Sequence, residues 1–464
     1  MDPGFTLFLI FIFPLYLVMI YYLVIAVKAY RSPRRLAASR SEGCRGCSLE
    51  VVIPIKNEPI GVVEKALRRN MEAFTSASCI SRVVVLSDDD AEYVGCLKRE
   101  IGGNGLVEVV RRENPKGGRT GALDSFFSAS RSSYILVLDA DAVVDSSTLE
   151  ALCREIGGED AYVIPWRGYA YEKTRVAEAM AFFTNLGTAL LYKLRWRAGF
   201  FIFPLGSGTA YRRSTILEVG GWGDNVIQDD IFMGVKLATT GHRTALLENG
   251  EVKVLVPSRL HALRKQQSRW AYGTSEVLAG SIRRLAAAKL PWSTKLEMVA
   301  YMMHPLHTLP TFTAFLLAPA IALAQPVGVS LRAQLLLVAS LVVPLVLLST
   351  IYGYLMYRLV PEIYEGGFKQ YLVNLGRFAA ILTVLSPHLS VSAVKGLLRT
   401  GYRWEVTPKG EKEKQLPREK TPHLITVWAL IGAILSLIAR NFYTFAISAS
   451  YLIAAVYSLL RLEL

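Results

Sequence analysis

The chain has 464 residues, of which 52% are hydrophobic and 19% are charged, and its 52 Lys and Arg against 38 Asp and Glu give a net charge of +14. Soluble domains carry about 25% charged residues, so this composition departs from that of a wholly soluble protein. Abundant apolar residues exclude a disordered chain, and five cysteines are too few for a disulfide-stapled miniprotein. The positive charge is compatible with nucleic acid, anionic lipid or a phosphorylated substrate.

The first apolar segment predicts an uncleaved membrane anchor over residues 1–30. Residues 5–27 carry no charge and are long enough to cross about 30 Å of hydrocarbon. Basic residues follow from Lys28, whereas only Asp2 precedes the segment, so the positive-inside rule places the N-terminus outside and the following chain in the cytoplasm. A cleaved signal peptide fits less well, because the basic flank lies on the wrong side. We expect an integral protein of the plasma (or ER-type) membrane.

Apolar segments return in residues 291–464, which we expect to form a C-terminal membrane and interface domain. Four of them are long enough to span a membrane, at about 298–325, 335–357, 423–439 and 442–460. Residues 371–398 are apolar but include Arg377, Pro387 and Lys395, which favours an interface helix or a re-entrant pair over a clean span. The total of five spans keeps the middle of the chain in the cytoplasm.

Residues 48–290 have the mixed composition of a soluble domain. Short apolar runs, which predict strands, alternate with helical patterns, and the runs lie at 49–55, 82–87, 106–110, 134–138 and 161–165. Buried strands separated by helices indicate an α/β, Rossmann-like and mostly parallel sheet. Such sheets bind ligands at the carboxyl ends of their strands. The amphipathic segment 176–197 fits a membrane-surface helix and a core helix equally well.

Acidic residues follow three of these predicted strands. Asn57-Glu58 follows the first, Asp88-Asp89 the second and Asp139-x-Asp141 the fourth. Carboxylates that converge on one crevice repel each other unless a cation neutralises them, and Mg²⁺ or Mn²⁺ prefers such oxygens and shares them with substrate phosphates. An isolated Asp-x-Asp is more often a turn or a cap, but its position after a buried strand favours a metal site here.

A glycine-rich turn with Lys116 and Arg119 precedes a predicted helix, a pattern that suits an anionic group, although alone it is equally typical of an ordinary loop. It is not a P-loop, because no G-x-x-x-x-G precedes the lysine, and this disfavours a nucleotide hydrolase. Gly206-Ser207-Gly208 lacks the third glycine of a dinucleotide-binding loop, so we reject that interpretation.

Two further motifs lie near the end of this domain. Gln228-Asp229-Asp230 precedes an apolar helix, where acidic residues are as often caps as catalytic groups. Gln266, Arg269 and Trp270 share one helix face at spacings i, i+3 and i+4. An amide, a guanidinium and an indole on one face suit a diphosphate and a sugar ring.

In this order the motifs resemble those of the membrane-integrated family 2 glycosyltransferases, which include cellulose, chitin and hyaluronan synthases and glycolipid-forming enzymes. The shared motifs are Pro54-x-x-Asn57-Glu58, Asp88-Asp89, the Lys116 turn, Asp139-x-Asp141, Gln228-Asp229-Asp230 and Gln266-x-x-Arg269-Trp270. Residues 406–410 are similar to the gating-loop motif of cellulose synthases. The resemblance covers nearly the whole chain and implies a GT-A fold and inverting, metal-dependent transfer of a hexose from a nucleotide-diphosphate sugar.

The resemblance also implies a role for each matching residue. Asp230 would be the general base, and Asp139 and Asp141 would bind Mg²⁺ or Mn²⁺. The residues that would bind the nucleotide sugar are Pro54, Asn57, Glu58, Asp88, Asp89, Lys116 and Asp139. Those that would bind the diphosphate and the acceptor are Trp222, Asp229, Gln266, Arg269 and Trp270.

Size and layout are closest to those of GDP-mannose-dependent β-mannosyltransferases that extend glycolipids. We therefore expect GDP-mannose, with a UDP-sugar as the alternative donor, and a lipid or glycolipid acceptor. A processive polysaccharide synthase is the first alternative, disfavoured because Gln-Asp-Asp replaces Thr-Glu-Asp and the C-terminal membrane part is short for a polymer channel. A transporter or sensor with a regulatory nucleotide-binding domain is the second. Basic residues gather after the first span, in 175–197 and in 264–269, which favours membrane surface and diphosphate over nucleic acid.

The cysteines suggest no disulfide framework. Cys44 and Cys47 form a Cys-x-x-Cys without a second pair, so we do not expect a zinc site. Cys79, Cys96 and Cys153 lie in the predicted cytoplasmic domain, where we expect buried thiols.

Overall fold

A seven-stranded sheet in the order β3-β2-β1-β4-β8-β6-β9 lies at the centre of the middle part of the chain. Its strands are β1 (Leu49–Ile55), β2 (Ile80–Ser87), β3 (Val107–Arg111), β4 (Tyr134–Val137), β6 (Ala161–Val163), β8 (Thr209–Arg212) and β9 (Thr244–Leu246). β1 pairs in parallel with β2 and β4, whereas β8 runs antiparallel to β4 and β6. The predicted mostly parallel sheet is confirmed, and β8 is an antiparallel strand whose four residues were too few for periodicity to predict.

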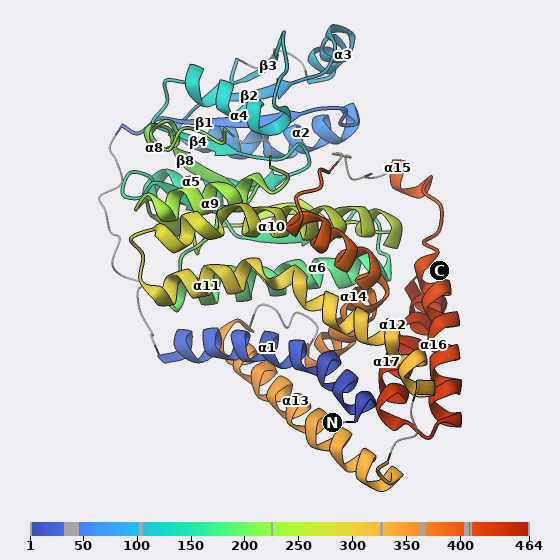
Figure 1. The fold of residues 1–464 in the computed structure, drawn as a ribbon. Coiled ribbons are helices and arrows are strands. Elements are labelled where there is room, and N and C mark those ends of the chain that lie inside the picture. The colour runs from blue at the N-terminus through green and yellow to red at the C-terminus, as the bar shows by residue number, and fades with distance from the viewer. Residues whose placement is uncertain are drawn as a thin grey trace.

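The structure is a computed structural model that describes residues 2–31, 46–101, 105–223, 226–324, 328–361, 367–402, 408 and 411–462. The α/β domain forms one part of the molecule, and long helices near both chain ends form the other (Figure 1). Cys44 and most of the predicted gating-loop motif at 406–410 lie outside the described residues.

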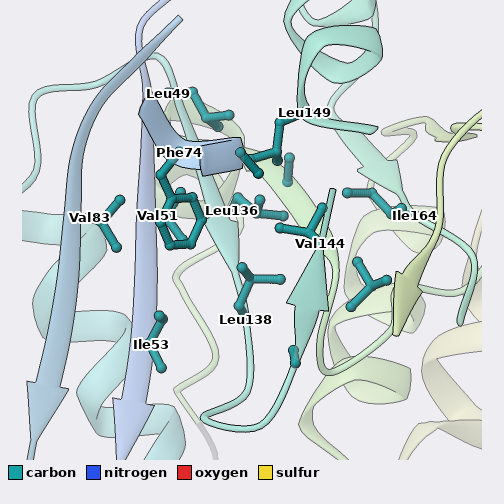
Figure 2. Packing of buried hydrophobic residues seen from close by; sticks show 14 of the residues in the cluster. Leu49, Val51, Ile53, Phe74, Val83, Leu136, Leu138, Val144, Leu149 and Ile164 are labelled. Carbon is teal, nitrogen blue, oxygen red and sulfur yellow. The ribbon is translucent and has the colours of Figure 1, made fainter. Parts of the chain in front are cut away.

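Helices cover both faces of the sheet at β1. Val51 packs with Phe74 of α2 (Ile60–Ser76) on one face, as Figure 2 shows. Val52 packs with Leu123 and Phe127 of α4 (Gly118–Ala129) on the other. Because β1 is buried on both sides, its apolar run is nearly continuous, and its carboxyl end is the part left for polar chemistry.

The remaining elements of the domain extend this frame. They are α3 (Ala91–Ile101), α5 (Ser146–Glu155), α8 (Arg213–Glu218), α9 (Asp229–Thr239), α10 (Leu260–Ala287), α11 (Trp292–Met302) and a small sheet of β5 (Val143–Val144), β10 (Val252–Leu255) and β7 (Trp166–Tyr169). The amphipathic segment forms α6 (Arg175–Thr188), the π-helix η1 (Ala189–Leu194) and α7 (Arg195–Arg197).

The expectation that Cys79 and Cys153 are unpaired thiols is wrong. The two residues form a disulfide between the start of β2 and α5, with their Cα atoms 5.6 Å apart and a sequence separation of 74. The expectation came from the predicted cytoplasmic location, where thiols are usually reduced, and the sequence carries no sign that β2 and α5 bring these two thiols together. Cys96 is a free cysteine.

Six helices in the described part of the chain are long and apolar enough to cross a membrane. They are α1 (Pro3–Arg31), the short η2 (His304–His307) continuing into α12 (Thr308–Ala324), α13 (Leu331–Leu359), α14 (Gly367–Leu397), α16 (Thr421–Ile438) and α17 (Phe442–Tyr457) continuing into η4 (Ser458–Leu462). The span expected from residue 298 begins later, because α11 ends at Met302 and Pro305 lies in a separate 3-10 turn.

Contacts between helix ends group the ends of α1, α13, α16 and α17 into two levels. At one level the α16–α17 turn meets two other helix starts: Gln334 of α13 donates to the Arg440 carbonyl and accepts from the Phe442 N–H, and Gly4 of α1 lies against Asn441. The other ends of α13 and α17 contact the α/β domain, where Arg197 donates to the carbonyl of Leu359 at 3.3 Å and Arg175 to that of Arg461 at 2.9 Å.

α14 is one continuous helix, so residues 371–398 do not form the helical pair of a re-entrant segment. Both of its halves contact the α/β domain. Arg377 is paired with Glu178 of α6 at 2.8 Å, and Phe378 stacks on Phe183 with ring centroids 3.6 Å apart. Near its end, Gly396 leaves room for the backbone of Tyr272 in α10.

A buried ion pair connects the first apolar helix to the α/β domain. The Arg195 guanidinium contacts the Glu297 carboxylate through two hydrogen bonds of 2.7 and 2.9 Å. The hydroxyl of Tyr21 in α1 donates to the same carboxylate at 2.8 Å. Arg195 is 0% exposed, so its charge depends on this partner.

We predict that Glu297→Gln lowers the thermal stability of the detergent-purified protein, because it leaves a buried guanidinium without its counter-charge, at a cost of about 3–5 kcal/mol. Glu150→Gln is the matched control, since Glu150 forms an exposed pair with Arg154 at 3.9 Å. Such surface pairs contribute little. Equal melting temperatures for the two variants would contradict this role of Glu297.

Candidate active site

The carboxyl ends of β1 and β2 bring several predicted residues together. Asn57 adopts a left-handed conformation with φ 57°, and its N–H donates to the Asp89 carboxylate at 2.8 Å. The Glu58 carbonyl accepts from the Tyr93 hydroxyl at 2.7 Å. Pro54 lies on β1 opposite Leu86 of β2, one strand position before the end. These contacts hold both strand ends in one edge of the sheet.

Arg112 connects the Asp88 carboxylate to the basic turn before α4 by hydrogen bonds. The Arg112 guanidinium contacts both Asp88 carboxylate oxygens at 2.6 Å and donates to the carbonyls of Lys116 and Gly118, each at 3.3 Å. Asp88 therefore helps to hold the turn before α4. The Lys116 side chain is exposed, so its contact with a nucleotide stays a prediction.

Arg119 is the basic residue after this turn that reaches the carboxylates at the strand ends. Its guanidinium lies between two carboxylates, 3.1 Å from Asp139 and 3.1 Å from Asp229, and also donates to the Gly206 carbonyl. Burial disfavours its charge, but Asp229 and Asp139 outweigh burial and raise the pKa of Arg119. One guanidinium thus joins the end of β4 to the start of α9.

The segment Gly206-Ser207-Gly208 binds the backbone of Asp139 and the carboxylate of Asp230. The Ser207 hydroxyl accepts from the Asp139 N–H at 2.9 Å, and the Gly206 N–H donates to Asp230 at 2.8 Å. The Trp166 indole donates to the Ser207 carbonyl at 2.6 Å. The glycines therefore build a carboxylate-binding turn, consistent with the rejection of a dinucleotide loop.

Asp230 is a buried carboxylate of the site, 6% exposed, at the start of α9. One of its oxygens accepts from the Gly206 N–H and the other from the Ile231 N–H, both at 2.8 Å. Burial and then the adjacent Asp229 carboxylate raise the pKa of Asp230 to about 7, against these N–H donors and Arg119. Burial raises the pKa of Asp229 too, and Arg119 opposes the rise.

Close packing of α10 fixes the Gln228-Asp229-Asp230 motif from the other side. A Cβ atom on Gly273 would lie 2.9 Å from the Gln228 Cβ and 3.0 Å from its backbone N, so only glycine fits there. Three residues further along α10, the Glu276 carboxylate accepts from the Ile227 N–H at 3.0 Å.

The predicted face of α10 lies beside these carboxylates. Burial lowers the pKa of Arg269, and the nearby carboxylates of Asp139 and Asp229 oppose this shift. The Arg269 guanidinium is therefore close enough to these carboxylates to interact with them electrostatically. The Trp270 ring lies 6.3 Å from that of Trp166. Gln266 precedes them on the same helix and is half-buried.

The prediction that Trp222 binds the acceptor is wrong. Its side chain is 1% exposed and packs edge-on against Phe127 and Tyr211 in the core. Its backbone N–H donates to Asp124 of α4 at 2.7 Å. Trp222 therefore fixes the turn before the Gln228-Asp229-Asp230 motif, and its assignment to the acceptor came from the family resemblance alone.

The predicted metal ligands Asp139 and Asp141 supply at most two carboxylates. Within the described ranges, no group of three or more His, Cys, Asp or Glu side chains is arranged to hold a metal ion. The Asp139 side chain is 46% exposed, whereas Asp141 is 5% exposed as a residue. This donor set fits Mg²⁺ or Mn²⁺ if substrate phosphates and water complete the shell, the usual arrangement for Mg²⁺.

Two functional residues of the site were not among the predicted ones. Arg119 was noted only as part of a basic turn, and Arg112 was not considered. The signal that could have identified Arg119 is its position in the first turn of a helix, directly beyond two glycines, where its side chain points back toward the strand ends.

The arrangement combines a buried carboxylate of raised pKa with two guanidinium groups and an exposed carboxylate at a strand end. The first can accept a proton near neutral pH. The others can bind an anionic leaving group. The crevice therefore fits displacement at a carbon that carries a phosphate-type leaving group.

Comparisons with known proteins agree with this chemistry. The profile of the family described as Glycosyl transferase family group 2 matches residues 134–386. A probable glycosyltransferase of Sulfolobus acidocaldarius is 26% identical over 389 residues, which cover 83% of this chain and 81% of that protein. Putative cellulose synthase 2 of Komagataeibacter xylinus is 26% identical over 378 residues, which cover 76% of this chain but 24% of that protein.

A solved structure shows the same fold. The mannosyltransferase from Pyrobaculum calidifontis, in complex with GDP-Man and Mn²⁺, matches with a TM-score of 0.53 at 18% identity, covering 85% of this chain and 100% of that one. The α/β domain is therefore a GT-A fold, as the motifs implied.

We predict that Gly273→Ala lowers kcat by about tenfold to a hundredfold, because the added methyl group pushes α10 away from Gln228, and a displacement of about 1 Å in an active site can cost about a hundredfold. Gly280→Ala on the same helix is the control, since its Cβ would meet only the Arg399 side chain, at 3.8 Å. Steady-state kinetics of both purified variants check this, and equal losses would contradict it.

Proposed function

The chain belongs to glycosyl transferase family group 2, and on that premise we propose that it moves a hexose, with mannose favoured, from a nucleotide-diphosphate sugar to a lipid-linked or other membrane-borne acceptor hydroxyl at the cytoplasmic face. Enzymes of this family invert the configuration of the transferred sugar. The observation that carries the proposal is Asp230, a buried carboxylate whose pKa is raised to about 7 beside the Arg119-bridged Asp139 and Asp229.

Asp230 is proposed as the general base. The acceptor oxygen forms a bond to the anomeric carbon while the bond from that carbon to the diphosphate oxygen breaks, and the hydroxyl proton passes to the Asp230 carboxylate. A sugar hydroxyl is a weak nucleophile, so a positioned base is worth roughly 10²–10⁴-fold. A single displacement of this kind inverts the anomeric carbon.

The leaving nucleoside diphosphate gains negative charge as the bond breaks. The guanidinium groups of Arg119 and Arg269 stabilise that negative charge. Backbone N–H groups at the start of α4 stabilise it further. A Mg²⁺ or Mn²⁺ ion held by Asp139 and Asp141 would supply further positive charge to the diphosphate. Asn57, Glu58, Asp88 and Asp89 are left for the nucleoside, at the ends of β1 and β2.

GDP-mannose is the favoured donor and a UDP-sugar the alternative. Support comes from the size and layout of the chain and from a fold shared with a mannosyltransferase solved with GDP-Man and Mn²⁺. The acceptor is proposed as a lipid or glycolipid because the site lies in a domain joined to apolar helices at both ends.

Two alternatives compete with this proposal. Similarity to a putative cellulose synthase favours a processive synthase, but this chain spans 24% of that protein and has few helices for a polymer channel. A transporter or sensor with a regulatory nucleotide-binding domain would not need a base such as Asp230.

The proposed membrane topology has five spans, with α14 as an interface helix. This helix is the least hydrophobic and the most buried of the six apolar helices in the described part of the chain. Because α14 contacts α6 and α10 along both halves, its two ends lie on the side of the α/β domain. α1, α12, α13, α16 and α17 then cross the membrane, with the N-terminus outside and the catalytic domain in the cytoplasm.

We predict that Asp230→Asn abolishes sugar transfer while nucleotide-sugar binding persists, because the amide cannot accept the proton but keeps the shape of the site. Release of nucleoside diphosphate from a panel of nucleotide sugars with Mn²⁺ or Mg²⁺ and a lipid extract measures transfer. Asp229→Asn is the comparison, since Arg119 already neutralises that carboxylate, and we expect it to retain part of the activity. Full activity of Asp230→Asn would remove the assignment of the base.

A further inference from the structure

A carboxylate from a distant part of the chain caps the helix that carries Arg269. One oxygen of Glu413, in the short helix α15 (Glu411–Lys414), accepts from the N–H groups of Ser258 and Arg259 at 2.6 and 2.7 Å. Its other oxygen accepts from the Ser258 hydroxyl at 2.9 Å. Arg259 is the N-cap of α10 and makes no side-chain cap of its own, so Glu413 supplies the cap.

The same junction fixes a second helix. The Ser258 carbonyl accepts from the Thr174 hydroxyl at 2.7 Å, and that hydroxyl also caps α6 by accepting from the Ala177 N–H at 3.1 Å. Ser258 therefore ties the starts of α6 and α10 to α15. One turn further along α10, Arg264 pairs with Glu419 at 2.6 Å.

Charge and burial make Glu413 a strong contact. It is 5% exposed, and a carboxylate at a helix N-terminus is favoured by the helix dipole as well as by its N–H donors. Removing it would leave two backbone donors at the start of α10 without their acceptor. The adjacent Lys414 differs, because its pair with Glu172 is partly exposed at 2.9 Å.

A second contact holds α10 beyond the predicted diphosphate-binding face. The Tyr272 hydroxyl accepts from the Gly401 N–H at 3.1 Å, and Gly396 of α14 packs on the Tyr272 backbone. Gln266, Arg269 and Trp270 lie between Ser258 and Tyr272 in sequence, so the stretch of α10 that carries them is anchored at both of its ends.

We propose that Glu413 is a positioning residue for the diphosphate-binding side chains of α10, Arg269 above all. This inference rests on the proposed function, in which Arg269 meets the charge of the nucleoside diphosphate. Guanidinium contacts with phosphate need a defined geometry, so a shift of the helix start weakens binding of the diphosphate more than binding of the nucleoside end, which β1 and β2 hold.

The test compares two ligands that differ by one phosphate. Titration calorimetry on the full-length, detergent-purified protein with Mg²⁺ gives Kd for a nucleoside diphosphate and for the matching monophosphate, with guanosine and uridine nucleotides both tried. We expect Glu413→Ala, which removes the acceptor of both backbone N–H groups, to raise the diphosphate Kd about tenfold, the scale of a lost helix cap, and to leave the monophosphate Kd within about twofold.

The controls separate positioning from a loss of fold. Lys414→Met is expected to leave both constants within about twofold, and Ser258→Ala, which removes one donor to Glu413, to raise the diphosphate Kd by about threefold. A wild-type protein that binds no nucleoside diphosphate would overturn the proposed function and this inference with it. Wild-type binding together with an unchanged ratio of the two constants in Glu413→Ala and Ser258→Ala would overturn the inference alone.

Discussion

The site depends on one guanidinium held between carboxylates that would otherwise repel each other. Arg119 joins Asp139 at the end of β4 to Asp229 at the start of α9, two elements that no backbone pairing connects at that point. In a poorly hydrated crevice two bare carboxylates would each be pushed toward protonation. Because Arg119 pairs with Asp229 and not with Asp230, the second carboxylate keeps a raised pKa and is left for proton transfer. In the proposed mechanism, the groups for the leaving diphosphate and for proton transfer are thus arranged around a single side chain.

α10 connects this chemistry to the rest of the molecule. Gly273 allows it to approach Gln228, Glu276 binds the Ile227 N–H, and Arg269 enters the field of the acidic crevice. The same helix packs on α14 along its outer side. The proposed catalytic motif is therefore braced by α10, which in turn packs on α14 of the apolar C-terminal part, and this suits an enzyme whose acceptor is proposed to come from a membrane.

Strands and strand-end carboxylates could be predicted from the sequence, because β1, β2 and β4 are apolar runs and parallel sheets bring their carboxyl ends together. The predictions that failed concern features that tertiary contacts determine. Lys116 and Arg119 are both basic residues of one turn, and only the start of α4 decides which of them enters the crevice. Trp222 follows glycines as a ligand-binding residue could, yet it fills the core. Cys79 and Cys153 lie 74 positions apart, so their pairing carries no local signal.

The most direct test of this account is the pH dependence of kcat/KM for the wild-type protein and for Arg119→Gln. A base must be ionised to accept a proton, so wild-type kcat/KM should rise about tenfold per pH unit below the pKa of Asp230 and level off above about pH 7. Arg119 lowers the pKa of Asp230, so replacing Arg119 should move the rising part of the kcat/KM profile to higher pH. A wild-type profile that is flat or falls with pH through this range would contradict the account. So would a rise in kcat/KM that occurs at the same pH in Arg119→Gln as in the wild type.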